Sequence, residues 1–460
     1  MHGKWLAAIC LAASGAMAQD PTPQTLFTNV HVFNGMQGER IENASVLVAG
    51  NRISAVSADA IDAPRAQVID GGGRTLMPGL IDGHVHLNLT GAFHDINDLE
   101  NAEWDLIGAT AAANARDYLM DGYTTVRDTG GLSGVGLKRV IDSGILPGPR
   151  IYASSAVISQ TSGHGDFRLA FQRLPGAALS NGERLNITQI VDGVDAMREA
   201  VRRNLSFQAS FIKLTTGGGV TSVLDPLYSS GFTRAEIEAA VEEAAHYGTY
   251  VTVHAYRDHD VRRSIEAGVK AIEHGHMIQD DTMRMLTERG IFLVLNLAGT
   301  SPSLRSHPHY APQTPSGKKL AQLLDGMREL KSLIHKHRPK VVHNVDTVLQ
   351  TVDMARLHRD HEKWALADYI GNLGALRAMT STAGELMALT GKRNPYPDGK
   401  LGVIAPGAYA DIILVDGNPL EDLRVLGANE KMFDATPRGE GIATIPFVMK
   451  GGQIFRDTRP

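Results

Sequence analysis

The chain has 460 residues, a formal net charge of −5, and a composition that is 43% hydrophobic and 21% charged. This length and composition are ordinary for a globular protein with one large core or two. Because there is no basic excess, we expect no nucleic-acid partner and no binding to an anionic membrane surface.

The first 18 residues predict a secretory signal peptide. Lys4 gives a positive start, an apolar core spans residues 6–13, and Ala-Met-Ala at 16–18 is a small-residue cleavage site. The apolar run is shorter than the roughly 20 residues that a membrane-spanning helix needs. The only cysteine, Cys10, lies in this segment, so we expect a mature chain without disulfides. The expected location is the periplasm, after export across the inner membrane.

Both ends of the chain show the alternating apolar pattern of short strands. Residues 26–33 and 44–48 alternate near the N-terminus, and residues 410–416 and 445–450 do so near the C-terminus. We therefore expect a small β-sandwich domain built from residues 24–75 and 395–456.

The middle of the chain alternates predicted strands and helices. The predicted strands are 80–86, 123–128, 150–154, 211–215, 250–254, 271–273, 291–297 and 340–346. The predicted helices are 104–120, 187–204, 233–247, 258–267, 316–337 and 366–389. About eight βα repeats indicate an α/β fold, a TIM-like (β/α)8 barrel over residues 76–394. A doubly wound open sheet is the alternative.

Two further segments invite an interpretation. The proline-rich residues 301–315 follow the seventh predicted strand and are long enough to form a lid. A loose group of histidines could bind metal, but its spacing suits no single face, so solvated helix and loop positions are favoured. These histidines are His335, His337, His343, His358 and His361.

The most informative segment is Met77–His86, a short apolar strand that ends in His-Val-His. Alternate residues of a strand share a face, so His84 and His86 would lie about 6–7 Å apart on one side. Two imidazoles placed in this way can bind one metal ion.

Further metal-binding side chains follow the other predicted strands, at the edge where barrel enzymes carry their chemistry. The complete set is His84, His86, Lys213, His254, His274 and Asp346. It exceeds the needs of one tetrahedral zinc and suits two ions that share a bridge. Taken singly, each residue has a plainer interpretation: a core histidine, a salt-bridged lysine or a helix N-cap aspartate.

Seven motifs carry a resemblance to a known family. They are Met77–His86, Gly122–Asp128, Gly163–Asp166, Phe211–Lys213, Val253–Tyr256, Ile272–Gly275 and Ala410–Pro419. The chain resembles the metal-dependent amidohydrolase superfamily, in its prolidase- and imidazolonepropionase-like branch. Within that branch it is similar to bacterial amidohydrolases that cleave ochratoxin A and to related exported dipeptidases.

The resemblance implies two divalent metal ions, expected to be zinc. The more buried ion would have His84, His86 and Asp346 as ligands, and the second would have His254 and His274. Lys213 would be carboxylated and bridge both ions. Chemistry supports this role, because an unmodified lysine, with a pKa of about 10.4, would repel two dications.

The resemblance also implies roles around the substrate. The ions would activate a water molecule for attack on an amide carbonyl. Asp346 would take the proton and pass it to the leaving nitrogen. Tyr256 would bind the substrate's α-carboxylate, and His164 would face the pocket and support the carbonyl oxygen.

The implied activity is hydrolysis of the amide bond to a C-terminal amino acid. The substrate would be a dipeptide or an N-acyl amino acid with a free carboxylate, such as ochratoxin A, which would give ochratoxin alpha and phenylalanine. A cyclic-amide hydrolase or deaminase of the imidazolonepropionase type is the alternative enzyme. A metal-free scaffold is disfavoured because all six candidate ligands are present. Relatives suggest a homo-oligomer, with an octamer as the candidate assembly.

One segment departs from the family pattern. Asn344-Val345-Asp346 replaces the usual Gly-Thr-Asp, and the Pro-His-Gly that normally follows is missing. The aspartate is kept, so activity is expected. The altered pocket wall means that the side-chain preference of ordinary dipeptidases does not carry over.

Overall fold

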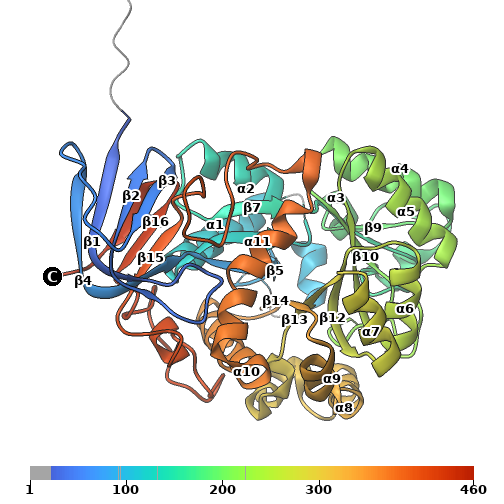
Figure 1. The fold of residues 1–460 in the computed structure, drawn as a ribbon. Coiled ribbons are helices and arrows are strands. Elements are labelled where there is room, and N and C mark those ends of the chain that lie inside the picture. The colour runs from blue at the N-terminus through green and yellow to red at the C-terminus, as the bar shows by residue number, and fades with distance from the viewer. Residues whose placement is uncertain (1–21, 92, 94, 132, 223) are drawn as a thin grey trace, which may run out of the picture.

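The computed structural model of the chain describes residues 22–91, 93, 95–131, 133–222 and 224–460. The predicted signal peptide, residues 1–18, lies outside the described residues. Figure 1 shows a strand-rich part formed by both chain ends beside a larger part in which strands and helices alternate. No helix in the described ranges is long and apolar enough to cross a membrane.

Strands from both chain ends form one seven-stranded sheet, in the order β17-β16-β15-β4-β1-β2-β3. Their bounds are β1 (Gln24–Val32), β2 (Ile41–Ala49), β3 (Arg52–Ser57), β4 (Gln67–Pro78), β15 (Ile412–Val415), β16 (Phe447–Lys450) and β17 (Gln453–Asp457). β4 joins the two ends, because it pairs in parallel with β1 and antiparallel with β15. The described strands from the two chain ends form this one sheet. The second layer of a sandwich therefore stays a prediction, as do the domain boundaries.

The middle of the chain carries parallel strands in two sheets. β5 (Leu80–Val85), β6 (Tyr123–Asp128) and β7 (Arg150–Ala153) form a sheet of three. A sheet of seven has the order β14-β13-β12-β11-β10-β8-β9. Its bounds are β8 (Val157–Ser159), β9 (Thr188–Ile190), β10 (Ile212–Thr215), β11 (Val251–Arg257), β12 (Ala271–Met277), β13 (Phe292–Leu295) and β14 (Lys340–His343). The α/β class is confirmed, while closure of these strands into one barrel stays a prediction.

Helices alternate with these strands. The α-helices are α1 (Trp104–Met120), α2 (Ser133–Asp142), α3 (Asn181–Arg184), α4 (Val194–Ser206), α5 (Arg234–His246), α6 (Asp258–Glu266), α7 (Asp280–Glu288), α8 (Pro315–Gly326), α9 (Leu330–His337), α10 (Val352–Ala378) and α11 (Ser381–Ala388). The 3-10 helices are η1 (Ile96–Asn101), η2 (Ala170–Arg173), η3 (Ala298–Thr300), η4 (Pro302–Ser306), η5 (Pro308–Tyr310), η6 (Gly391–Arg393) and η7 (Leu423–Leu426).

Several predicted elements need correction. The predicted helix 187–204 starts later, at Val194, because residues 188–190 form β9. The predicted helix 316–337 is two helices, α8 and α9. The predicted helix 366–389 begins much earlier, at Val352, and contains a break at Gly371, where φ is 74°. Only glycine adopts this backbone conformation readily, so the helix is kinked at Gly371 although the sequence pattern continues through it.

The larger part has its core between strands and helices, and the strands themselves are buried along their length. β5, β6, β10 and β12 are lined almost entirely by buried residues. These strands are covered on both faces, so their buried residues follow one another without the alternation of a half-exposed strand. Because neighbouring strands run parallel, their carboxyl ends meet at one edge and bring distant residues together.

Candidate metal centre and active site

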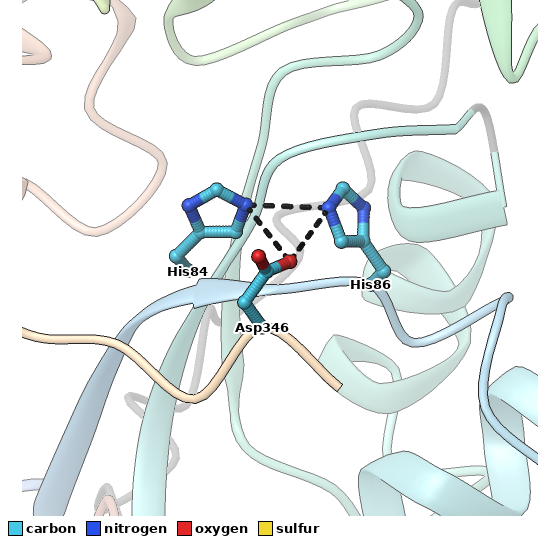
Figure 2. Close-up of side chains that lie close together, drawn as sticks. All are labelled: His84, His86 and Asp346. Carbon is cyan, nitrogen blue, oxygen red and sulfur yellow. Dashed lines mark hydrogen bonds and ion pairs between the residues drawn. The ribbon is translucent and has the colours of Figure 1, made fainter. Parts of the chain in front are cut away.

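Three side chains converge at the end of β5. The Nε2 atoms of His84 and His86 lie 3.2 Å apart. They lie 3.5 Å and 3.4 Å, respectively, from Oδ1 of Asp346. Figure 2 shows both rings turned toward the same carboxylate. Within the described residues, these three form the group of histidines and carboxylates close enough to hold one ion.

The ring orientation of His84 is fixed by a buried charge pair. Its Nδ1 lies 2.9 Å from Oε2 of Glu273, and Nη1 of Arg127 donates to Oε1 of the same carboxylate at 2.8 Å. Burial alone would raise the pKa of Glu273, but the charges of Arg127 and Lys213 outweigh it and hold the pKa well below the ordinary value. Histidine ligands of metals are commonly held by a carboxylate in this way, which leaves Nε2 for the ion.

Arg127 and Glu273 were not assigned a role from the sequence, although both lie in motifs that carry the family resemblance. Arg127 is completely buried and also donates to the hydroxyl of Tyr250, at 3.0 Å, and to the carbonyl of Gly83, at 2.8 Å. Its guanidinium lies 4.1 Å from the ring centroid of Phe211. The sequence offered one signal for this pair, an arginine and a glutamate inside two strands predicted to be buried. Such residues are rarely buried without a partner of opposite charge.

His254 and His274 lie beside the first group, on β11 and β12. Their ring centroids are 4.6 Å apart, and the His274 ring is 5.3 Å from that of His84. Nδ1 of His274 contacts Oδ1 of Asn296 at 2.8 Å, while its Nε2 lies 3.9 Å from Oδ2 of Asp346. The His274 ring therefore presents Nε2 to the same space as His84 and His86.

Two of these residues have unusual backbone. The φ angle is 77° at His274 and 53° at Asp346, in the left-handed region that L-residues rarely adopt. Such conformations persist where the surrounding structure fixes them, and they occur often at functional sites. Asp346 is also not the N-cap of a helix, because Thr351 caps α10. The plainer interpretation of Asp346 is thereby excluded.

Lys213 lies on β10 with its side chain buried, and its Nζ has no hydrogen-bond partner among the described residues. Burial lowers its pKa to about 8, partly opposed by the charges of Glu273 and Asp346. The ordinary alternative, a salt-bridged lysine, does not fit this amine. A buried, unpaired amine whose pKa is lowered toward neutral pH fits carboxylation, because carbon dioxide adds to the neutral form.

Two imidazoles of the site, those of His84 and His274, are held in the form that binds metal. Burial, with a smaller contribution from Lys213, lowers the pKa of His84 to about 3. Burial likewise lowers the pKa of His274 to about 3. Both rings are therefore neutral near pH 7, and neutral imidazole is the ligand form. The donor set of neutral histidines, a carboxylate and an unpaired lysine fits divalent metal ions.

All eight residues predicted from the sequence line one pocket: His84, His86, His164, Lys213, His254, Tyr256, His274 and Asp346. The lining also includes the apolar residues Leu89, Val157, Phe167, Ile187 and Leu349. The pocket thus combines candidate metal ligands with apolar surface.

His164 packs flat against a predicted metal ligand. Its ring lies 4.0 Å from that of His254, and its Nδ1 is 2.8 Å from Oγ of Ser222 and 3.3 Å from Oδ2 of Asp225. A Cβ on Gly219 would come within 2.0 Å of the His164 ring, so only glycine permits this approach. Ser222 and Asp225 were not assigned from the sequence. Their spacing follows no recognisable motif.

The interpretation of the histidine group as solvated is wrong for three of its members. His343, His358 and His361 are buried, whereas His335 is exposed and His337 pairs with Asp280 at 2.8 Å. The polar residues around His358 and His361 on α10 are paired inside the protein. In the sequence alone, such internally paired polar residues cannot be distinguished from the solvent-exposed face of a helix.

A comparison with protein families agrees with this geometry. The model described as "Amidohydrolase family" matches residues 75–357, which is more than half of the chain. The chain therefore belongs to the amidohydrolase family, as predicted, and is a hydrolase that acts on amide bonds. Members of this superfamily are generally metal-dependent, in keeping with the group His84, His86 and Asp346.

Individual relatives narrow the comparison. The chain is 27% identical over 435 residues to an ochratoxinase of Aspergillus niger, covering 91% of this chain and 84% of that protein. The crystal structure of A. niger ochratoxinase superposes with a TM-score of 0.78 and 25% identity, over 95% of this chain and 96% of that one. A prolidase complexed with N-methylphosphonate-L-proline gives a TM-score of 0.80 and 31% identity, covering 95% and 100% of the two chains. A Xaa-Pro dipeptidase with methionine bound in its active site gives 0.77 and 25%, covering 94% and 100%.

Proposed function

We propose that this amidohydrolase uses two divalent metal ions, expected to be zinc, to hydrolyse the amide bond to a C-terminal amino acid. The substrate is a dipeptide or an N-acyl amino acid with a free carboxylate, and ochratoxin A is one candidate. The observation that supports this proposal is the convergence of all six candidate ligands on one pocket. The names of the ochratoxinase and the two dipeptidases support the same substrate class.

In this proposal His84, His86 and Asp346 hold one ion. His254 and His274 hold the other, and carboxylated Lys213 bridges them. When bound, such ions activate water and polarise a carbonyl oxygen. The unpaired Nζ of Lys213 supports the bridging role, because addition of carbon dioxide turns the amine into an anionic oxygen donor.

Three residues act on the substrate. The Asp346 carboxylate accepts the proton of the attacking water and delivers it to the leaving nitrogen, which leaves poorly as an anion. Its pKa would be raised by burial, but the facing histidines hold it below the ordinary value, so the group starts as a carboxylate. Tyr256 binds the α-carboxylate, and His164 supports the carbonyl oxygen. The contacts of His164 Nδ1 with Ser222 and Asp225 are consistent with this role, because they occupy Nδ1 and leave Nε2 for the substrate.

A substrate panel tests the proposal. Zinc-loaded enzyme is incubated with dipeptides, N-acyl amino acids and ochratoxin A, each as the free acid and as the C-terminal amide. We expect turnover of free acids and at least a hundredfold loss on amidation. Metal analysis should give about two ions per chain. Turnover of cyclic amides or imidazolonepropionate in place of these substrates would support the alternative enzyme.

The location and the assembly are further proposals. Export to the periplasm is supported by the signal-peptide pattern of residues 1–18. Mass spectrometry of the secreted protein should show a mature chain that starts after Ala18. A homo-oligomer, with an octamer as the candidate, is checked by light scattering, in which a monomer would contradict it.

A further inference from the structure

A second cavity adjoins the metal pocket. The two share Tyr256 and Asp346 in their walls. The second cavity is enclosed by the segment that follows β13, which contains η3 and η4, and by residues of α8 and α10. We call it the side cavity. Because Tyr256 lies at the junction, a substrate whose carboxylate meets this hydroxyl has an adjacent group at the entrance to the side cavity.

The side cavity has a mixed lining of apolar and polar residues, and its polar part includes two buried histidines. Its apolar part contains Leu304, Leu320, Leu323 and Met327. His276 is 4% exposed and His358 is 5% exposed, and both belong to the lining. A buried imidazole needs partners for both nitrogens, so each ring indicates what the cavity can bind.

His276 presents a hydrogen-bond acceptor. Its Nε2 lies 2.6 Å from the backbone carbonyl oxygen of Asn296. A carbonyl oxygen only accepts, so the ring proton is on Nε2. Nδ1 is buried and has no hydrogen-bond partner among the described residues. In a neutral ring this nitrogen accepts a hydrogen bond, and a group inside the cavity can supply the donor.

His358 presents a donor. Its Nδ1 lies 2.9 Å from the side-chain Nε2 of Gln350 and 3.3 Å from its Oε1, and we assign the amide as the donor from the shorter contact. The ring proton is then on Nε2 of His358, since a neutral imidazole carries one. This Nε2 is buried without a hydrogen bond, with the nearest carboxylate oxygen, on Glu362, 3.7 Å away.

We infer that the side cavity binds the side chain of the substrate's C-terminal amino acid and selects an uncharged carboxamide, that of glutamine or asparagine. This inference rests on the function proposed above. The carboxamide oxygen accepts from Nε2 of His358, and its NH2 group donates to Nδ1 of His276. The apolar surface of the metal pocket, with Phe167 and Ile187, receives the acyl group.

Two competing classes of side chain are disfavoured. An apolar side chain of the same size leaves both histidine nitrogens buried and unpaired, which is the strongest form of discrimination available to a binding site. A carboxylate side chain enters a cavity whose lining offers no arginine or lysine. Its charge is then desolvated without a countercharge, which is costly.

The test uses four N-benzoyl amino acids with zinc-loaded enzyme. Glutamine, glutamate and methionine have side chains of similar length, and leucine is a shorter apolar control. We expect kcat/KM for the glutamine substrate to exceed that for each of the others by at least about tenfold. Calorimetry with the free amino acids gives a second readout, in which glutamine should bind more tightly than methionine.

Variants locate the preference. His358→Phe and His276→Phe should each reduce the glutamine-to-methionine ratio to about one, in both rate and binding. His361→Phe is the matched control, because His361 is also buried on α10 but does not line the cavity, so the ratio should stay as in the wild type. Metal content is measured for every variant.

The outcomes separate the two proposals. Hydrolysis of all four substrates without a preference for glutamine, or an unchanged ratio in both histidine variants, overturns the side-cavity inference alone. Failure of metal-loaded enzyme on every free-acid substrate overturns the proposed function, and the inference falls with it.

Discussion

Nδ1 of His84 lies 2.9 Å from Oε2 of Glu273, and this contact determines which nitrogen of His84 remains for a metal ion. Arg127 donates to the other oxygen of Glu273, so the carboxylate stays charged although it is completely buried. The three residues come from β5, β6 and β12, which are adjacent only in the folded protein. The geometry of the candidate metal centre therefore depends on a pair that does not line the pocket.

Replacement of Glu273 by glutamine should weaken metal binding. The amide can still contact His84, but it no longer holds the ring proton as a charged acceptor, and Arg127 loses its counter-ion. Loss of such a supporting carboxylate typically costs about 10–100-fold in metal affinity. Zinc dissociation constants measured by chelator competition check this. Glu288→Gln, at an exposed position, is the control, and an equal affinity in Glu273→Gln and wild type would contradict the positioning role.

Lys213→Ala should lose metal and activity together, because the proposed bridge between the two ions is removed. A short carboxylic acid such as acetate can enter the vacated space, so partial rescue of activity is expected. Metal content is measured by atomic absorption, with Lys270→Ala, at an exposed position, as the control. Unchanged metal content in Lys213→Ala would end the bridging assignment.

Asp346→Asn should reduce kcat by about 10²–10⁴-fold, the usual contribution of general acid–base catalysis. The amide keeps the shape of the side chain but cannot accept and return a proton. Metal content and circular dichroism show whether the centre and the fold remain. Turnover at the wild-type rate with full metal would refute the proton-transfer role.

Gly219→Ala should disturb His164 without removing a ligand. The new Cβ would lie within 2.0 Å of the imidazole, so the ring must leave its present position against His254. We expect kcat/KM to fall at least about tenfold, in line with the sensitivity of catalysis to small displacements, while metal content stays unchanged. Gly136→Ala on α2, where nothing lies within 4 Å of the new Cβ, is the control. Equal kinetics in both variants would exclude His164 from catalysis.

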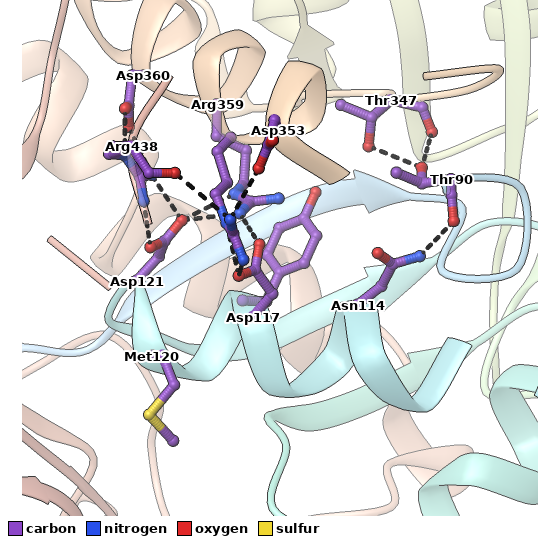
Figure 3. A network of polar contacts seen from close by, with 12 residues as sticks. Thr90, Asn114, Asp117, Met120, Asp121, Thr347, Asp353, Arg359, Asp360 and Arg438 are labelled. Carbon is purple, nitrogen blue, oxygen red and sulfur yellow. Dashed lines mark hydrogen bonds and ion pairs between the residues drawn. The ribbon is translucent and has the colours of Figure 1, made fainter. Parts of the chain in front are cut away.

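A buried ionic network away from the metal site makes stability depend on pH (Figure 3). Nη2 of Arg359 donates to Asp121 at 2.8 Å, as does Nη2 of Arg438, and Arg359 also contacts Asp117. Burial would raise the pKa of Asp121, but the charges of Arg359 and Arg438 hold it well below the ordinary value.

Because this pKa is depressed, the stability that Asp121 contributes is fully present above its unfolded pKa of about 3.9 and is lost as pH falls below that value. Asp121→Asn should cost about 3–5 kcal/mol near pH 7, since it leaves buried arginines without their partner. Below about pH 3.9 the difference from wild type should narrow by about 1.4 kcal/mol per pH unit. Denaturant unfolding at pH 7, 5 and 3 measures it, and a constant difference would contradict the assignment.

Sequence reasoning located most strands of the larger part because they are short segments rich in apolar and β-branched residues that end at recognisable motifs. Tyr123–Asp128 was predicted with the observed bounds. The sequence analysis missed β8 and β9, because strands of three residues carry too little periodicity to distinguish them from loops.

The side chains that line the metal pocket could also be predicted, since metal-binding residue types at strand ends are unusual. The residues that support these side chains from outside the pocket could not be predicted. His358 lies in a run of charged and polar residues on α10 that resembles a solvated face, yet the run is buried because its members pair with distant partners. Such pairing is a property of the tertiary structure and leaves no local pattern.

The same helix has a consequence for redesign. Nε of Arg438, in the C-terminal part of the chain, donates to Oδ2 of Asp360 at 2.6 Å. Asp360 is only two residues from His358 on α10. Loss of this contact would therefore displace the part of α10 that lines the side cavity. Any redesign of that cavity through His358 would have to keep Arg438 or replace it together with Asp360.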